Sequence, residues 1–421
     1  MAEKKEGYPM RKPTLLCALL LLAGQLAQAA VSVLIGLSLP RTGHYRAGAV
    51  DVAQGALLAV DDINAQGGVL SKRLVLDIRD SGSNVEQAQR NVTAFAAQGA
   101  AMVMGGGSTE ETIAAGRQAA SQRMLYLAAF NHANEITGRD GHRHLFREPA
   151  NDWMTAQALG QYLAWNRPNQ RYYYVVSNDG WGLGTEEGLR RTTGSQDKAR
   201  HGFTRIAPDA AGQKSYQQVV DKIRKVRPDM LVLALQGHHL LQMMRTLESN
   251  GLLKELQVII PHLSPAMIEE IGLHSMQGVM GVQSWTWRVP ALEKSPRGER
   301  FVRDYVARYQ VYPGSMAASA YATVVQWAEA AERTGKLSAD AIIGALERHE
   351  YQLLKGVQHW RDFDHQNVQD VYVVQVRERS AILASPMRQD YFSILHRMDG
   401  AEAAQTFEDW QKERGEQLEL Q

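Results

Sequence analysis

The chain has 421 residues, of which 44% are hydrophobic and 22% are charged, and its 46 Lys and Arg residues nearly balance its 45 Asp and Glu residues. This composition is that of a globular protein with enough residues for two hydrophobic cores. The near-neutral charge excludes the concentrated basic surface that nucleic acid or an anionic membrane requires, so neither is expected as a partner.

The N-terminus has the three parts of a secretory signal peptide. Basic residues precede an apolar run over residues 15–22, and the small residues Ala27 and Ala29 follow it. Because this run is shorter than the roughly 20 residues that span a bilayer, we predict a signal peptide over residues 1–29 and export to the periplasm without membrane insertion. The single cysteine, Cys17, lies in this leader, so no thiol site or disulfide is expected in the mature chain.

After the leader, apolar runs typical of strands alternate with segments of helical periodicity. In the predicted helix 50–65, Ala53, Leu57, Val60 and Asn64 recur at helical spacing, and Gly67 follows its end. Such alternation predicts parallel sheets. The first series of predicted strands covers residues 31–39, 73–80, 100–106 and 124–129.

A second series begins near Trp153 with a predicted helix that extends to Asn166. Its predicted strands cover residues 171–178, 202–207, 229–236 and 257–262, with helices between them. The remaining predicted elements are an extended run over 276–287, helices over 298–309, 315–333 and 338–347, and a strand over 371–376. Residues 390–421 are predicted to form a mostly polar helical tail.

One run of residues is similar to a known family. The segment from Gly55 to Leu70 (GALLAVDDINAQGGVL) resembles the first helix and turn of the type I periplasmic solute-binding proteins of the branched-chain amino acid transporter family. Weaker matches follow in the expected order along nearly the whole mature chain. These matches are residues 105–109, 135–137, 179–184 and 312–313, with Tyr321.

The resemblance implies an α/β fold of two Rossmann-like lobes with parallel sheets joined by three crossings, which we place near Glu148, Ser284 and Gly356. Lobe 1 is then expected over residues 30–148 and 285–355, lobe 2 over 149–284 and 356–388, and the tail over 389–421. Ligand is expected in the cleft between the lobes, at the carboxyl ends of the strands. Hinge closure of the lobes is the implied motion.

The glycine-rich stretch that ends at Ser108 and Thr109 is the first candidate ligand contact. It follows a predicted strand and opens a helix, where backbone N–H groups and hydroxyls suit an anionic or carbonyl oxygen. By resemblance this is where a ligand carboxylate is held. The alternative is that one of these two residues only caps the helix.

Further candidates follow later strands. By resemblance, Phe130, Asn131 and His132 replace the smaller residues that relatives present to ligand, which predicts a pocket of different shape. Trp181 matches an aromatic residue that covers the ligand from lobe 2, with loop packing as the alternative. Tyr45, which follows the first strand, is also expected to line the cleft.

Gln236 and His262 end two strands of the second series, where amino-acid binders often have a Tyr and an acidic residue. A neutral histidine does not replace a carboxylate as partner of a ligand ammonium, so the sequence argues against a plain α-amino acid. His238 and His239 lie near Gln236, but adjacent histidines rarely ligate one ion, and we expect no metal and no cofactor. For the aromatic residues Trp285 and Trp287 we favour core or interlobe packing over ligand contact.

The sequence therefore predicts a binding protein and not an enzyme. We expect it to capture a small-molecule ligand for an ABC transporter permease of the inner membrane, a partner inferred from the resemblance. One alternative is a ligand-sensing binding protein that docks on a membrane receptor. A hydrolase that uses Ser108 and His132 is a third possibility, which the lack of a Gly-x-Ser-x-Gly motif around Ser108 disfavours.

Overall fold

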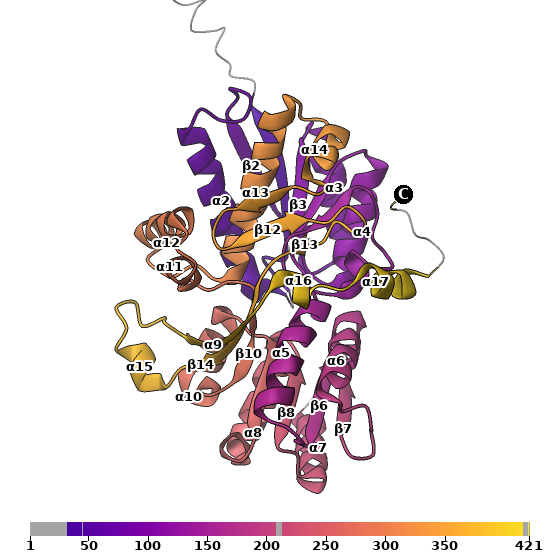
Figure 1. Ribbon diagram of the computed structural model, residues 1–421, viewed down its shortest axis with the longest axis vertical. Coiled ribbons are helices and arrows are strands. Elements are labelled where there is room, and N and C mark those ends of the chain that lie inside the picture. The colour runs from indigo at the N-terminus through magenta and orange to yellow at the C-terminus, as the bar shows by residue number, and fades with distance from the viewer. Residues whose placement is uncertain (1–31, 44, 208–212, 416–419, 421) are drawn as a thin grey trace, which may run out of the picture.

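The alternating strands and helices form two open sheets, one at the centre of each lobe (Figure 1). The structure, a computed structural model, describes residues 32–43, 45–207, 213–415 and 420. The predicted signal peptide lies outside the described residues. Among the described residues, no helix is both long enough and apolar enough to cross a membrane.

Lobe 1, in the upper half of Figure 1, contains a five-stranded sheet in the order β2-β1-β3-β4-β5, with all neighbouring strands parallel. Its strands are β1 (Val33–Leu39), β2 (Leu74–Asp80), β3 (Met102–Gly106), β4 (Tyr126–Phe130) and β5 (Leu145–Arg147). Its helices are η1 (Arg46–Gly48), α2 (Ala49–Ala65), α3 (Val85–Ala97), α4 (Thr109–Ser121), η2 (Asn134–Ile136), α11 (Val289–Leu292), α12 (Pro296–Tyr309), α13 (Ser315–Thr334) and α14 (Ala339–Leu346).

Alternation along the strands divides the core of lobe 1 between two faces. Leu127 and Ala129 of β4 pack with α2 and α13, whereas Tyr126 and Ala128 pack with α3 and α4. Successive side chains of a strand point to opposite faces, so an apolar strand needs helices on both sides. This requirement explains why the predicted strands are continuous apolar runs.

Lobe 2 contains a seven-stranded sheet in the order β15-β14-β10-β9-β8-β6-β7. Five strands are parallel, and β14 and β15 are antiparallel to their neighbours. Its strands are β6 (Tyr172–Ser177), β7 (Gly202–Ile206), β8 (Met230–Ala234), β9 (Gln257–His262), β10 (Met280–Gln283), β14 (Val371–Val376) and β15 (Phe392–Met398). Its helices are α5 (Asp152–Asn166), α6 (Gly180–Thr193), α7 (Gln213–Val226), α8 (Gly237–Ser249), η3 (Leu252–Lys254), α9 (Pro265–Ile271), α10 (Leu273–Met276) and α15 (Arg379–Leu383).

A buried lysine joins the three crossings between the lobes. Lys355 Nζ donates hydrogen bonds to the carbonyl of Ser284 and to Gln369 Oε1. Gln369 Nε2 in turn donates to the carbonyl of Glu148. One residue of each crossing therefore takes part in a single buried network, and burial lowers the pKa of Lys355 to about 8.

The third crossing lies at residues 369–370, not near Gly356 as predicted. Between these positions, β11 (Glu350–Gln352), β12 (Val357–Trp360) and β13 (Asn367–Val368) form a small antiparallel sheet. Trp360 of β12 packs edge-on against Phe146, and Gln366 forms a bridge with Arg147. These contacts with β5 place residues 357–368 against lobe 1, although the predicted boundary assigned them to lobe 2. A boundary set by tertiary contacts leaves no local signal in the sequence.

The prediction of a helical tail is wrong for residues 392–398, which form β15 at the edge of the lobe 2 sheet. Its burial pattern alternates along the strand, as in an edge strand with one solvated face. The chain then continues as α16 (Gly400–Ala403) and α17 (Phe407–Arg414), and Trp410 Nε1 donates to the carbonyl of Thr137 in lobe 1. We call residues 399–415 the C-terminal strap, because they return from lobe 2 to lobe 1.

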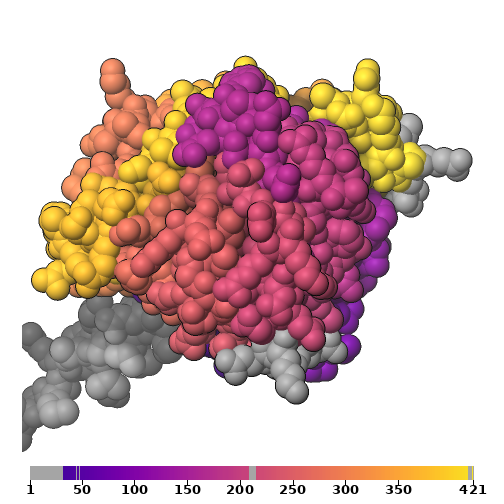
Figure 2. Space-filling view, turned by 90° about the horizontal axis from the view of Figure 1, so that it is seen from below, coloured from indigo at the N-terminus to yellow at the C-terminus, as the bar shows by residue number. Residues whose placement is uncertain are grey.

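The C-terminal region reaches the surface on two sides of the molecule. Figure 1 shows α15 on the left and α17 on the right, and Figure 2, seen from below, shows yellow atoms at both places. In the chain, α15 lies between β14 and β15, and α17 follows β15. The strap therefore passes across the region where the lobes meet.

Candidate functional site

The structure brings all nine predicted ligand residues together at the carboxyl ends of β1, β3, β4, β6, β8 and β9. Two adjoining cavities lie there, between the lobes, and both are lined by Tyr45, Phe130, His132 and Gln236. The first cavity is also lined by Ser108, Thr109, Asn131 and Trp181. The second is also lined by His262. The lobes approach each other closely across this cleft. Gly180 of lobe 2 lies so near Glu135 of lobe 1 that a Cβ atom added to Gly180 would be 3.2 Å from Glu135 Oε1.

Ser108 caps helix α4 and also lines the cleft. Its Oγ accepts a hydrogen bond of 3.1 Å from the backbone N–H of Glu111, so the capping alternative is observed. The hydroxyl hydrogen of Ser108 is not used in this bond. Together with the N-terminal dipole of α4, it can face an oxygen of a bound molecule.

Behind this helix N-terminus lies a buried carboxyl group that the sequence analysis missed. Glu111 is 2% exposed, and its carboxylate fills the space beside Gly107. Burial raises its pKa to about 7. A group with this pKa is partly protonated at neutral pH, which lessens the repulsion that a bound anion would otherwise meet.

Asn131 stabilises the loop around the cleft. Its Nδ2 donates to the carbonyl of Gly107 at 3.0 Å, and its Oδ1 accepts from the N–H of Ala133 at 2.9 Å. Both ends of the amide are thus bonded to backbone. Asn131 therefore lines the first cavity, but its side-chain hydrogen bonds are made to the backbone and hold the glycine-rich loop.

The two cleft histidines face one another from opposite lobes. His132 and His262 are stacked, with ring centroids 4.1 Å apart, and His262 Nε2 lies 2.6 Å from Asp152 Oδ1. Burial lowers the pKa of His132 and of His262, and it raises the pKa of Asp152. Asp152, on the first turn of α5, is therefore an acidic residue of the site that the sequence analysis missed.

The sequence indicates that a helix begins at Asp152, but it contains no indication that Asp152 contacts His262. Asn151 precedes it as an N-cap, with its side chain accepting from the N–H of Met154. This cap predicts a helix start at Asp152. The contact with His262, across 110 positions of the chain, follows from the packing of α5 beside β9.

From lobe 2, Trp181 and Gln236 close the cleft. Trp181 packs against apolar residues of both lobes, and its ring lies 6.0 Å from that of His262. Its buried Nε1 has no hydrogen-bond partner among the described residues. Gln236 is the N-cap of α8 without a side-chain capping bond, so its amide is available to a bound molecule.

Tyr45 reaches the cleft from the loop that precedes η1. Its backbone N–H donates to Ser83 Oγ at 3.1 Å. Burial raises the pKa of the Tyr45 phenol, and the charges of Asp179 in lobe 2 and Glu110 in lobe 1 raise it further. Asp179 and Glu110 also line the first cavity, so this end of the cleft is more acidic than the sequence analysis predicted.

The geometry does not support the hydrolase alternative. Ser108 Oγ bonds the N–H of Glu111, whereas His132 Nδ1 bonds the carbonyl of Ala150 at 2.7 Å. A nucleophile and its general base must be within hydrogen-bond reach of one another, and Ser108 and His132, both described residues, make no hydrogen bond with one another. Over the described part of the chain, no cluster of three or more His, Cys, Asp or Glu side chains could hold a metal ion.

Comparison with known proteins agrees with this architecture. A Leu/Ile/Val-binding protein of Rhizobium johnstonii is 25% identical over 209 residues, which cover 49% of this chain and about half, 55%, of that protein. A leucine-, isoleucine-, valine-, threonine- and alanine-binding protein of Pseudomonas aeruginosa is 22% identical over 332 residues, which cover 78% of this chain and 86% of that protein. Both are named as binding proteins.

The fold itself recurs in solved structures. A periplasmic binding protein of Burkholderia mallei superposes with a TM-score of 0.78 at 17% identity, covering 90% of this chain and 97% of that one. The model of the family described as periplasmic binding protein matches residues 32–381, which include the lobe 1 sheet and every strand of the lobe 2 sheet except β15. The chain has the type I periplasmic binding protein fold, and it belongs to the periplasmic binding protein family.

Proposed function

We propose that the protein is the extracytoplasmic solute-binding component of an ABC importer, which captures a small polar ligand in the interlobe cleft. The observation that carries this proposal is the convergence of residues from both lobes on one cavity: Ser108 and Thr109 from lobe 1 and Trp181 and Gln236 from lobe 2. A ligand that contacts both lobes stabilises the closed arrangement over the open one. The names of the relatives, all binding proteins, support the same function.

The chemistry of the cleft favours a ligand with a carboxylate or carbonyl end. The N-terminus of α4 and the Ser108 hydroxyl supply donors for an oxygen, and the Gln236 amide supplies a donor and an acceptor. Phe130 and Trp181 supply apolar walls. Because His262 is neutral and bonded to Asp152, it offers no free negative charge to an α-ammonium group.

A thermal-shift screen of the purified mature chain tests the proposal. The panel contains aliphatic amino acids, amides, ureas, aromatic acids and other small carboxylates. A ligand present at a hundredfold excess over its dissociation constant stabilises the folded state by about 2.7 kcal/mol. One chemical class is expected to raise the melting temperature, and a folded protein that responds to no member of the panel would contradict the proposed function.

A further inference from the structure

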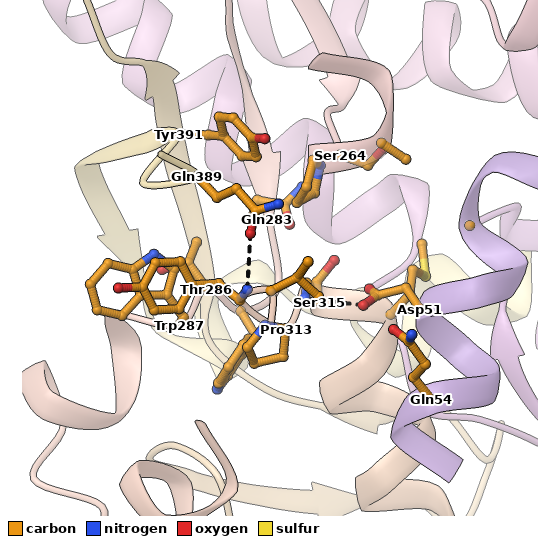
Figure 3. A pocket seen from close by; sticks show the side chains of 18 of the residues that line it. Asp51, Gln54, Ser264, Gln283, Thr286, Trp287, Pro313, Ser315, Gln389 and Tyr391 are labelled. Carbon is orange, nitrogen blue, oxygen red and sulfur yellow. Dashed lines mark hydrogen bonds between the residues drawn. The ribbon is translucent and has the colours of Figure 1, made fainter. Parts of the chain in front are cut away.

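Beyond the two cleft cavities lies a larger chamber of about 260 Å³. It shares Gly48, Ser264, Gln283, Ser315 and Met316 with the second cleft cavity, so the two spaces adjoin. Figure 3 shows Trp287 on one side of the chamber and Asp51 and Gln54 of α2 on the opposite side. This chamber contains none of the nine residues that the sequence singled out.

Aromatic side chains form much of the chamber wall. Trp287 and Tyr312 are stacked, with ring centroids 4.1 Å apart and planes inclined by 5°, and Tyr305, Tyr309 and Tyr391 also line the space. The guanidinium of Arg288 lies 5.1 Å from the centroid of the Trp287 ring. Aromatic rings of this kind can also contact an organic cation.

The charged residues in the lining are acidic. Asp51 accepts hydrogen bonds from the hydroxyl of Tyr305 and from the N–H groups of Gly314 and Ala317. Glu269 accepts from the hydroxyl of Tyr391 at 2.8 Å. Among the described residues that line the chamber there is no Lys, Arg or His, while Arg288 just outside is paired with Asp390. An anion placed there would meet the Glu269 carboxylate and the acidic side chain of Asp51, whose pKa burial raises, without a compensating cation.

A buried hydroxyl in the wall has no partner of its own. Thr286 is 4% exposed, it lines the chamber, and its Oγ1 has no hydrogen-bond partner within the described residues. An unpaired buried polar group costs free energy unless a bound molecule satisfies it. Rotation of the Thr286 side chain about χ1 would bring this oxygen to the chamber as an acceptor for an N–H donor.

We propose that this chamber binds the ammonium group of an organic amine, with the apolar part of the amine against Trp287 and Tyr312. The aromatic wall, the two carboxylates and the unpaired Thr286 hydroxyl together favour a cation with N–H donors. The inference rests on the proposed function, because the chamber adjoins the capture cleft. It adds that the ligand has a cationic end remote from the α4 N-terminus.

Three probes of nearly equal shape and different charge test the proposal: benzylamine, benzyl alcohol and benzoate, each titrated calorimetrically into the full chain. Benzylamine is expected to bind most tightly. Glu269→Gln is expected to weaken benzylamine binding about three- to fivefold, and Thr286→Val about tenfold. The exposed Glu255, which does not line the chamber, gives the matched control Glu255→Gln, and this variant is expected to bind benzylamine as the wild type does.

The outcomes separate the chamber from the cleft. Equal or tighter binding of benzyl alcohol, no binding of benzylamine, or an equal loss of benzylamine affinity in Glu255→Gln and Glu269→Gln would overturn the assignment to a cation. Benzoate, which the cleft can also bind, counts against the assignment only if it binds the double variant Trp181→Ala and Gln236→Ala at least as tightly as benzylamine does. Thr286→Val keeps the shape of the side chain and removes the unpaired hydroxyl, so its melting temperature without probe is expected to be at least that of the wild type. The cleft is tested independently with the panel compounds and the Trp181 and Gln236 variants, so either proposal can fail while the other stands.

Discussion

The imidazole rings of His132 and His262 are stacked 4.1 Å apart at the point where the two lobes meet. His132 follows β4 of lobe 1, and His262 ends β9 of lobe 2. Each ring also bonds the first crossing, His132 to the carbonyl of Ala150 and His262 to Asp152. Opening of the cleft must separate the two rings, so this stack connects the ligand site to the relative position of the lobes.

The protonation of His132 links stability to pH. Burial, and then the charge of His262, lowers its pKa from the ordinary 6.5 to about 3 in the folded state. Between these values the unfolded chain binds a proton that the folded chain does not. His132 therefore lowers the free energy of unfolding as pH falls from 6.5 towards 3, by up to about 1.4 kcal/mol per pH unit.

Urea unfolding of His132→Asn between about pH 7 and pH 4 checks this linkage. The amide of Asn can retain the bond to the Ala150 carbonyl, and the variant is expected to gain stability relative to wild type as pH falls. The exposed His238 gives the control, His238→Asn, which should follow the wild type at every pH. A constant difference between His132→Asn and wild type over this range would show that His132 is not held neutral.

Lys355 is expected to stabilise the junction of the three crossings. Lys355→Met removes the donor to Ser284 and Gln369 and leaves the buried Glu148 without its compensating charge. Removing one partner of a buried charged pair costs about 3 to 5 kcal/mol. Chemical unfolding measures this loss. Lys254→Met, at an exposed lysine, should change stability by no more than about 0.5 kcal/mol, and a similar small change in Lys355→Met would contradict the role of the network.

Close packing of α2 on α13 depends on Gly55. A Cβ atom there would overlap the backbone of Ala317, so Gly55→Ala is expected to force the helices apart and to destabilise the protein by about 1 to 3 kcal/mol. Gly344, in helix α14, has no atom within 4 Å of the position of a Cβ. Gly344→Ala is expected to stabilise by about 0.5 to 1 kcal/mol. Thermal unfolding of Gly55→Ala and Gly344→Ala measures both changes in stability, which are expected to have opposite signs.

The C-terminal strap is expected to depend on Trp410. This side chain is fully buried, and its Nε1 donates to the carbonyl of Thr137 at 3.0 Å. Truncation of a buried Trp to Ala costs about 3 to 5 kcal/mol, so Trp410→Ala should increase amide hydrogen exchange across residues 399–415. The exposed Glu408 of the same helix gives the control Glu408→Ala, which should leave this exchange unchanged. Unchanged exchange in Trp410→Ala would show that the strap is held elsewhere.

Much of the fold could be predicted from local patterns, because parallel strands between helices are continuous apolar runs. The predicted strands near residues 31–39, 73–80 and 229–236 are found as β1, β2 and β8. Short or half-polar strands were missed, among them β5 with three residues and the edge strand β15. The sequence of β15 is polar because one of its faces is solvated. As an edge strand it pairs only with β14, and this long-range pairing could not be predicted from local sequence.

The position of the candidate site was also predictable, since strand ends of one sheet edge meet in space. The charged groups of the site could not be predicted, because the burial of Glu111 and the contact of Asp152 with His262 depend on residues distant in the chain. The chamber was missed for a related reason. Its wall combines Asp51, Thr286 and Tyr391 from three separate parts of the chain. Trp287, for which packing was favoured over ligand contact, also contributes to that wall.

The most direct test of the capture cleft is a calorimetric titration of the compound that stabilises the wild type in the thermal-shift screen. It compares wild type with the double variant Trp181→Ala and Gln236→Ala, since Ser108 also caps a helix and its replacement would disturb the fold. Binding to the double variant is expected to be at least about tenfold weaker, with an unchanged circular dichroism spectrum. Equal affinity in the two proteins would contradict capture between the lobes.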